Sequence, residues 1–254
     1  MESCAIYQNP SGFGFLIGSL LALGIYVSYI PQHLKIVNRR TSEGLSPLFL
    51  LLGSTSGFSS LVNLLLVSSP ARKCCLTDLN KFQCIYSQLG LIQVAAQAVG
   101  YSLILILCAY LTRPPIDVPG SNEEKIGRAY RWFLIYVVLN AALAIYFLFF
   151  NADFNETMAF ANFSGILSTI LATAQYLPQI HTTYTLKHAG TLSMHMMLLQ
   201  TPGGYLWSFT LFMQPGSSWS SWLPYFTAAN LQLVLLIMCL YYRGRNPEET
   251  PLLG

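Results

Sequence analysis

One segment of this chain occurs twice, as GSLLALGIYVSYIPQHLKIVNRRTSEGLS at residues 18–46 and as GILSTILATAQYLPQIHTTYTLKHAGTLS at residues 165–193. A single offset of 147 residues aligns the two copies without a gap. It pairs Tyr29-Ile-Pro31-Gln32 with Tyr176-Leu-Pro178-Gln179. Apolar matches arise often by chance, but two Tyr-x-Pro-Gln sequences at one offset do not. The repeat therefore predicts a chain built from two similar halves.

The composition is that of a membrane protein. Of 254 residues, 54% are hydrophobic and only 9% are charged, whereas a soluble domain carries about 25% charged residues. A spanning helix needs about 20 mostly apolar residues. Seven segments meet this length: Phe13–Val37, Pro47–Val67, Gln88–Thr112, Tyr130–Phe150, Met158–Thr182, Met194–Met213 and Trp222–Tyr242. The sequence thus predicts an all-α integral membrane protein with seven transmembrane helices.

The basic residues predict the orientation. The connections on one side hold ten Lys and Arg residues and those on the other side hold three. Because cytosolic loops are enriched in Lys and Arg, we expect a luminal N-terminus and a cytosolic C-terminus. Four cysteines then fall on the luminal side, where disulfides form. These four are Cys4, Cys74, Cys75 and Cys84. They allow three disulfide pairings, and free buried cysteines are the alternative.

The repeat and the orientation together predict a 3+1+3 organisation. Three crossings reverse the chain, so a fourth helix is needed to give both repeats the same direction, a plan known in transporters. The expected divisions are the luminal N-terminus (1–12), the first three-helix repeat (13–112), a linker with the fourth helix (113–157), the second three-helix repeat (158–242) and the cytosolic tail (243–254).

The two Pro-Gln pairs are candidate hinges. Proline removes a backbone donor inside a helix, and the freed carbonyl needs another partner in a bilayer. Gln32 and Gln179 follow Pro31 and Pro178 directly and carry amide hydrogens that suit this role. Equivalent places in both halves favour a gate, and two static kinks are the alternative.

Polar residues inside the predicted spans are candidates for a solute path. A helix break is expected at Thr201-Pro202-Gly203-Gly204-Tyr205, because Pro-Gly-Gly at mid-membrane depth is tolerated where protein or a cavity covers it. Close helix packing through glycine is the alternative there. Interhelical hydrogen bonding is the alternative for the remaining candidates: Tyr29, Tyr176, Gln93, Gln97, Asn162, Thr173 and Asn230.

Several classes of function find no support. All ten acidic residues lie in predicted termini or loops, so no buried carboxylate serves as a proton relay or as a counter-ion for a cation. The sequence contains no metal-ligand cluster, phosphate loop or nucleophile elbow. With a net charge of +3 and no basic run, nucleic-acid binding is not expected. We expect neither enzymatic activity nor a cofactor.

The two Tyr-x-Pro-Gln turns, each followed by Leu-Ser, resemble those of the PQ-loop family. That family includes cystinosin, lysosomal and vacuolar cationic amino acid transporters and, more distantly, the SWEET sugar transporters. The resemblance covers about residues 13–242 and implies a seven-helix transporter that works by alternating access with Pro-Gln hinges. The stretch Gln200–Gly204 is similar to a fungal branch. Cationic amino acid members carry Gly-Asp in the second helix, whereas this chain has Gly53-Ser54.

The C-terminal tail adds a candidate sorting signal. The sequence EETPLL matches an acidic dileucine motif through Glu248, Leu252 and Leu253. Together with the resemblance, the motif favours an endomembrane location, in the vacuolar or lysosomal membrane or in endosomes.

These observations predict a transporter of a small polar solute, such as an amino acid or a sugar, with membrane lipids as its surroundings. A phospholipid scramblase and a non-transporting endomembrane sensor or partner protein are the alternatives. The sequence leaves open the substrate, proton coupling and whether the chain forms a homo-oligomer.

Overall fold

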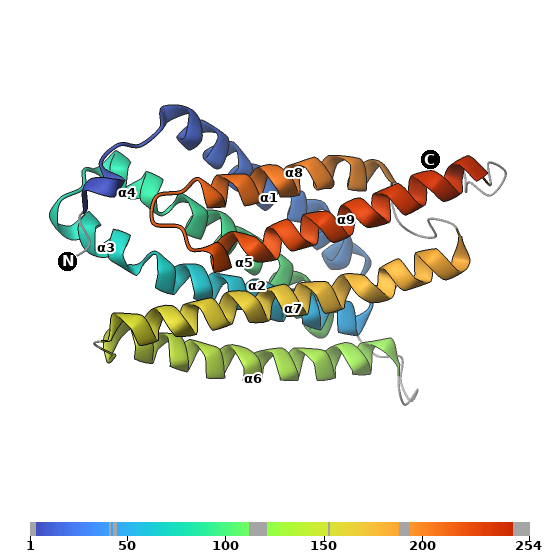
Figure 1. Cartoon of the computed structure of the whole chain (residues 1–254). Coiled ribbons are helices and arrows are strands. Elements are labelled where there is room, and N and C mark those ends of the chain that lie inside the picture. Colours follow the sequence, from blue (N-terminus) through green and yellow to red (C-terminus); the bar gives the residue numbers. More distant parts are fainter. Residues whose placement is uncertain are drawn as a thin grey trace.

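The computed structural model describes residues 4–40, 42, 45–111, 121–151, 153–187 and 194–245. These residues form helices and connections and include no strand. Seven helices are long, and three short ones lie near the N-terminal end of the bundle (Figure 1). The long helices are α1 (Gly12–Arg39), α2 (Pro47–Val67), α5 (Leu89–Leu111), α6 (Asn122–Phe149), α7 (Phe154–Leu186), α8 (Met194–Phe212) and α9 (Trp219–Arg245). The short ones are η1 (Cys4–Tyr7), α3 (Ser69–Thr77) and α4 (Lys81–Ser87).

Within the described residues, six helices are long and apolar enough to cross a membrane, namely α1, α2, α5, α6, α7 and α9. The seventh long helix, α8, has 19 residues and is not among them. The prediction of an all-helical membrane protein is confirmed. The 3+1+3 division into seven spans stays a prediction, although a long helix occupies each of the seven predicted segments.

Local signals explain where the first helices begin. The Ser11 side chain accepts a hydrogen bond from the Gly14 amide at 3.1 Å and thereby caps α1. Ser46 caps α2 in the same way, and Pro47 follows at the first helical position. The first amides of a helix have no acceptor within the helix. The serine side chain supplies an acceptor for one of them, and proline has no amide hydrogen that would need one.

The two repeats have the same internal arrangement. Helix α5 packs against both α1 and α2, and α9 packs against both α7 and α8. The long helices alternate in direction along the chain (Figure 1). We call the end that carries η1, α3 and α4 the capped end. The opposite end, toward which Pro31 and Pro178 lie in α1 and α7, is called the Pro-Gln end.

Helices α2 and α7 form the tightest connection between the repeats through three buried serines. The Ser56 hydroxyl donates to the Ser168 carbonyl at 3.0 Å, and the Ser168 hydroxyl donates back to the Ser56 carbonyl at 2.9 Å. Ser60 adds a hydroxyl–hydroxyl bond of 2.7 Å to Ser168. Small polar side chains of this kind allow close helix approach and hydrogen-bond across the interface in membranes.

The opposite interface between the repeats is much looser. The offset of 147 residues relates α1 to α7 and α2 to α8, so the pair α1 and α8 is the counterpart of α7 and α2. Helices α1 and α8 nevertheless touch at only a few positions. Helix α6 packs along α2 on the tight side (Figure 1). The bundle is therefore closed along α2 and α7 and sparsely packed along α1 and α8.

The serine contacts give a stability prediction. Ser168→Ala removes the hydroxyl that bonds the Ser56 carbonyl and the Ser60 hydroxyl, whereas the bond from the Ser56 hydroxyl to the carbonyl of residue 168 remains, so we expect thermal unfolding in detergent to occur at a lower temperature. The expected loss is about 1–2 kcal/mol. Ser164→Ala, one helical turn earlier, is the matched control, because within the described part of the chain the buried Ser164 hydroxyl bonds only the Phe160 carbonyl of its own helix, at 3.0 Å. Equal melting temperatures for the two variants would contradict the interface role.

Candidate functional site

Three tyrosines from α1, α5 and α7 form a cluster toward the Pro-Gln end. The phenol groups of Tyr29 and Tyr176 lie near each other and near that of Tyr101. The rings of Tyr29 and Tyr101 meet edge to face, with centroids 6.4 Å apart. The two tyrosines of the Tyr-x-Pro-Gln turns, which are 147 residues apart in sequence, thus come together at one place. We call Tyr29, Tyr101 and Tyr176 the tyrosine cluster.

The cluster is tied to α2 by the tyrosine of α5. The Tyr101 hydroxyl donates to the Phe49 carbonyl at 3.3 Å. It accepts a hydrogen bond of 2.8 Å from the side-chain amide of Gln175, which also reaches the Phe49 carbonyl at 3.3 Å. One hydrogen-bonded group therefore connects α2 and α5 of the first repeat with α7 of the second. Any separation of the repeats at this level has to break it.

A pair of buried hydroxyls lies at equivalent places in the two repeats. Ser54 is the eighth residue of α2 and Thr201 the eighth of α8, and the offset of 147 relates them. They are 0% and 3% exposed, and neither hydroxyl has a hydrogen-bond partner among the residues that the structure describes. Both lie about 10 Å along their helices from the Pro-Gln end. Buried polar groups are almost always paired, so an unpaired pair related by the repeat calls for a function.

Further unpaired polar atoms come from α5 and α9. The Gln97 carbonyl oxygen of α5 is buried without a partner and faces α2, where a Cβ on Gly57 would lie 3.4 Å from it. The Tyr225 hydroxyl of α9 is likewise buried. It lies near Ser60 of α2 but makes no hydrogen bond of normal geometry within the described residues, and its ring packs on Trp207 with centroids 4.2 Å apart. We call Ser54, Gln97, Thr201 and Tyr225 the unpaired polar set.

The Pro-Gly-Gly stretch differs from the expectation of a helix break. Helix α8 runs without interruption through Pro202, Gly203 and Gly204. Gly204 lies against Ala229 of α9, where an added Cβ would come within 3.2 Å of the alanine side chain. Close packing through glycine keeps the helix intact. Two of the candidate path residues meet, because the Tyr205 hydroxyl donates to the Asn230 amide oxygen at 3.0 Å.

Three other predicted path residues make interhelical or local hydrogen bonds. The Gln93 amide donates to the Gly18 carbonyl at 2.8 Å and joins α5 to α1. Asn162 accepts hydrogen bonds from Ser218 and Ser220 near the capped end. The Thr173 hydroxyl bonds the Thr169 carbonyl of its own helix at 2.8 Å. These contacts fit the alternative reading of interhelical and local hydrogen bonding.

Both Pro-Gln pairs lie inside continuous helices. Helix α1 continues past Pro31 to Arg39, and α7 continues past Pro178 to Leu186. The side-chain amides of Gln32 and Gln179 make no hydrogen bond within the part of the chain that the structure describes. The expected help from these amides to a freed carbonyl is therefore not seen in this conformation.

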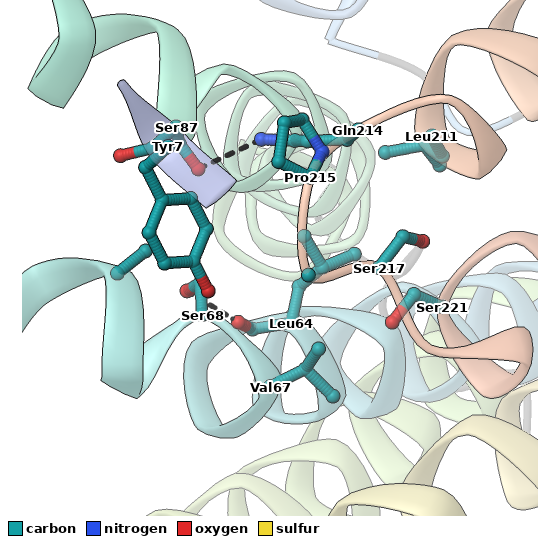
Figure 2. A pocket seen from close by; sticks show the side chains of 12 residues that line it. Tyr7, Leu64, Val67, Ser68, Ser87, Leu211, Gln214, Pro215, Ser217 and Ser221 are labelled. Carbon is teal, nitrogen blue, oxygen red and sulfur yellow. Dashed lines mark hydrogen bonds between the residues drawn. The ribbon is translucent and has the colours of Figure 1, made fainter. Parts of the chain in front are cut away.

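The space between the repeats is closed at the capped end. Tyr7 of η1 is 4% exposed and lines a cavity of about 20 Å³ together with Leu211 and Gln214 of the second repeat (Figure 2). A cavity of this size holds about one water molecule. The Gln214 amide also donates to the Ser87 carbonyl at 2.8 Å and so joins the two repeats. No solute could pass at this end without movement of these groups.

Arg72 strengthens the same end. Its guanidinium donates to the Ser68 hydroxyl at 2.7 Å and to the Leu65 carbonyl in the last turn of α2. A cation at a helix C-terminus is favourable because the free carbonyls carry partial negative charge. Burial lowers the pKa of the Arg72 guanidinium below its usual value.

Two disulfides hold the cap together. The structure joins Cys4 to Cys74 and Cys75 to Cys84, over sequence separations of 70 and 9 residues. The first fastens η1, and with it Tyr7, to α3. Cys108 and Cys239 are buried and form no disulfide within the described residues.

The separations predict unequal contributions to stability. Because a longer closed loop restricts the unfolded chain more, Cys4→Ser with Cys74→Ser should lower the free energy of unfolding by up to about 2 kcal/mol more than Cys75→Ser with Cys84→Ser. Thermal unfolding of both double variants in detergent measures the difference. A larger loss of stability on removal of the Cys75–Cys84 disulfide would show that strain or local packing, and not the entropy of the unfolded chain, determines how much each disulfide contributes.

Comparison with known proteins explains the repeat. The model of the PQ loop repeat matches residues 13–72 and 160–220. The chain belongs to the PQ-loop repeat family. The matched segments begin 147 residues apart, which is the offset that aligns the two Tyr-x-Pro-Gln sequences. An uncharacterized protein of Schizosaccharomyces pombe is 30% identical over 258 aligned positions, which cover 92% of this chain and 82% of that protein. The fungal relative agrees with the expected fungal branch.

Sequence reasoning missed three parts of this PQ-loop site. Gln175 directly precedes Tyr176, but its counterpart in the first repeat is Ser28, so the repeat gave no signal for it. The sequence of α2 is rich in serine, but nothing in it indicates that Ser56 and Ser60 pair with Ser168 of α7. Tyr225 lies in an apolar sequence and resembles an ordinary core residue. The sorting-signal residues Glu248, Leu252 and Leu253 lie outside the described residues.

Proposed function

We propose that this PQ-loop protein is a carrier of a small, polar, uncharged or zwitterionic solute, which binds between the two repeats. The observation that carries the proposal is the pair of unpaired hydroxyls, Ser54 and Thr201, at equivalent depths in the two repeats. A buried polar group without a partner is unfavourable, and a bound solute with hydroxyl or amide groups would pair both. Gln97 and Tyr225 add an acceptor and a phenol.

The charge distribution supports this choice of substrate class. In the described spans, acidic residues occur no deeper than the first helical turns, as Glu123 and Glu124 of α6 and Glu156 of α7. A buried carboxylate is the usual counter-ion for a cationic substrate and the usual carrier of a coupled proton. A neutral or zwitterionic solute needs no such group. The proposal includes no enzymatic activity, cofactor or nucleic-acid partner.

The mechanism that we propose is alternating access. The cap at Tyr7 and Gln214 closes one end in this conformation. The tyrosine cluster with Gln175 is the corresponding contact between the repeats at the Pro-Gln end. Breaking one contact while the other forms would expose the unpaired polar set to each side in turn. The serine-bonded α2 and α7 would serve as the pivot, because that interface is the tightest.

Binding to purified protein tests the solute class. We expect one or a few neutral or zwitterionic solutes from a panel of amino acids and sugars to raise the melting temperature, since a ligand that binds only the folded state stabilises it. Lysine and arginine should have no effect. Stabilisation by cationic amino acids alone would contradict the proposal, because the spans offer no counter-ion.

A phospholipid scramblase is the second candidate. The sparse packing of α1 against α8 favours it, because a lateral opening beside polar groups would admit a headgroup. In liposomes with a fluorescent phospholipid, scrambling would expose the label on both leaflets within minutes. We expect the carrier to leave the lipids static.

For location we propose an endomembrane of the vacuolar, lysosomal or endosomal kind, with the capped end in the lumen. The two disulfides support a luminal cap, because disulfides persist in oxidising compartments. An N-terminal epitope should be protected from protease in intact vesicles, and a C-terminal epitope should be cleaved. Cleavage of the N-terminal epitope alone would reverse the orientation.

A further inference from the structure

A groove of about 320 Å³ lies between α1 and α5 of the first repeat, and Tyr29 of the tyrosine cluster forms part of its wall. Tyr26 of α1 and Val99 of α5, which both line it, are each 62% exposed. Val99 shares one face of α5 with the other exposed large residues Ile92, Leu103 and Tyr110. In a membrane-spanning bundle this face meets lipid, so the groove opens to the hydrocarbon of the bilayer.

The two walls of the groove differ in character. Helix α5 presents small or apolar side chains at Ala95, Ala96 and Val99, together with Gly100. The ring of Tyr29 lies directly against Gly100, where an added Cβ would collide with it. Helix α1 contributes all the polar groups, from three residues at spacings of three and four, which share one face: Tyr26, Tyr29 and His33.

This shape favours a rigid ligand over a flexible chain. Small residues in a row leave a smooth, shallow surface along the helix axis. An acyl chain that lies on it loses the freedom of many rotatable bonds, whereas a fused-ring molecule has little to lose, so preorganisation favours the rings. The groove is also closed by polar groups on one side only, which suits a molecule that is apolar except for a single group.

The end of the groove offers one hydrogen-bond acceptor. The Nε2 atom of His33 lies 2.8 Å from the Gly100 carbonyl, and because a carbonyl only accepts, Nε2 carries the hydrogen. In the neutral imidazole, Nδ1 then has a free lone pair. His33 lies about 9 Å before the end of α1. Helix α1 has 28 residues, or about 42 Å against a hydrocarbon core of about 30 Å, which places His33 near the membrane interface.

We propose that the groove between α1 and α5, which no residue of the unpaired polar set lines, binds a sterol. The fused rings lie along Ala95, Ala96 and Val99, and the single hydroxyl, at the level of the interface, donates to Nδ1 of His33. The sequence Val27-x-Tyr29-x₅-Lys35 also matches a short pattern proposed for sterol contact. That pattern is weak by itself, and the groove gives it a place in the structure.

Photolabelling of the full chain tests the site. The protein is placed in phosphatidylcholine nanodiscs that contain a photoactivatable cholesterol analogue, and labelled peptides are identified by mass spectrometry. We expect label on residues 26–33 and 95–103 that excess cholesterol removes. Val99→Trp fills the groove and should reduce the label severalfold. Val138→Trp, on a face of α6 where Val138 is 65% exposed, should leave it unchanged.

Two ligand comparisons separate the possible occupants. The 3-keto analogue of cholesterol has no hydrogen to donate to His33, so it should compete about fivefold less well than cholesterol, the effect of one hydrogen bond. Removal of the label by excess phosphatidylcholine would overturn the proposal in favour of an acyl chain. Crosslinks between two copies through this groove would overturn it in favour of a protein interface. Neither result would bear on the solute site, which has its own binding test.

Discussion

Pro31→Leu and Pro178→Leu should each reduce solute flux by about tenfold or more, with the protein still folded. Proline lacks the amide that would bond the carbonyl four residues earlier, which is that of Val27 in α1 and that of Ala174 in α7. Leucine supplies this amide and makes the helix stiffer. If α1 and α7 bend here when the tyrosine cluster opens, the stiffer helix raises the free energy of the bent state and slows the cycle.

Uptake into proteoliposomes measures this effect, and the melting temperature in detergent shows whether the variants fold. Pro224→Leu is the matched control, because Pro224 also lies inside a spanning helix but does not precede glutamine. Its flux should stay near that of the parent protein. Normal flux in both Pro-Gln variants would show that the two prolines are static kinks, and the hinge assignment would have to be abandoned.

The double variant Ser54→Ala with Thr201→Val should bind the solute about tenfold more weakly, yet melt at the same temperature or higher. Each lost hydrogen bond to a neutral group weakens binding by a factor of roughly two to ten. In the free protein these hydroxyls are buried without partners, so their removal takes away an unfavourable term. Function and stability are expected to change in opposite directions, as they do at sites kept for a ligand.

The control for this variant is Thr55→Val. The Thr55 hydroxyl lies beside Ser54 but donates to the Leu51 carbonyl of its own helix at 2.8 Å. Its loss should leave solute affinity unchanged. A double variant that is destabilised while its affinity stays normal would show that Ser54 and Thr201 are structural, and the solute site would then have to lie elsewhere.

Much of the fold could be predicted because its signals are local or repeated. Twenty apolar residues in a row require a helix in a bilayer, and Tyr-x-Pro-Gln at one offset requires two similar halves. The Pro-Gly-Gly stretch failed as a predictor because a helix with glycine can stay intact when a neighbour packs closely, as Ala229 does against Gly204. Local sequence does not report that neighbour.

The partners across helices could not be predicted for a related reason. The repeat predicts equal halves, but the asymmetry of the bundle arises where the halves meet. Ser168 finds Ser56 and Ser60 on α2, whereas nothing comparable joins α1 to α8 among the described residues. The disulfide pairing also depends on how η1 folds back onto α3. The sequence shows four cysteines on the luminal side but not this fold, so it leaves all three pairings open.

Counterflow in proteoliposomes tests the carrier proposal most directly. Vesicles that contain the purified protein are loaded with an unlabelled solute, and the entry of the same labelled solute is followed at a range of concentrations. We predict entry that is saturable, selective for one stereoisomer and faster when the solute is present inside, because a site open to one side at a time returns sooner when occupied. Flux that rises in proportion to concentration, or no flux of any solute while lipids move between leaflets, would contradict the carrier.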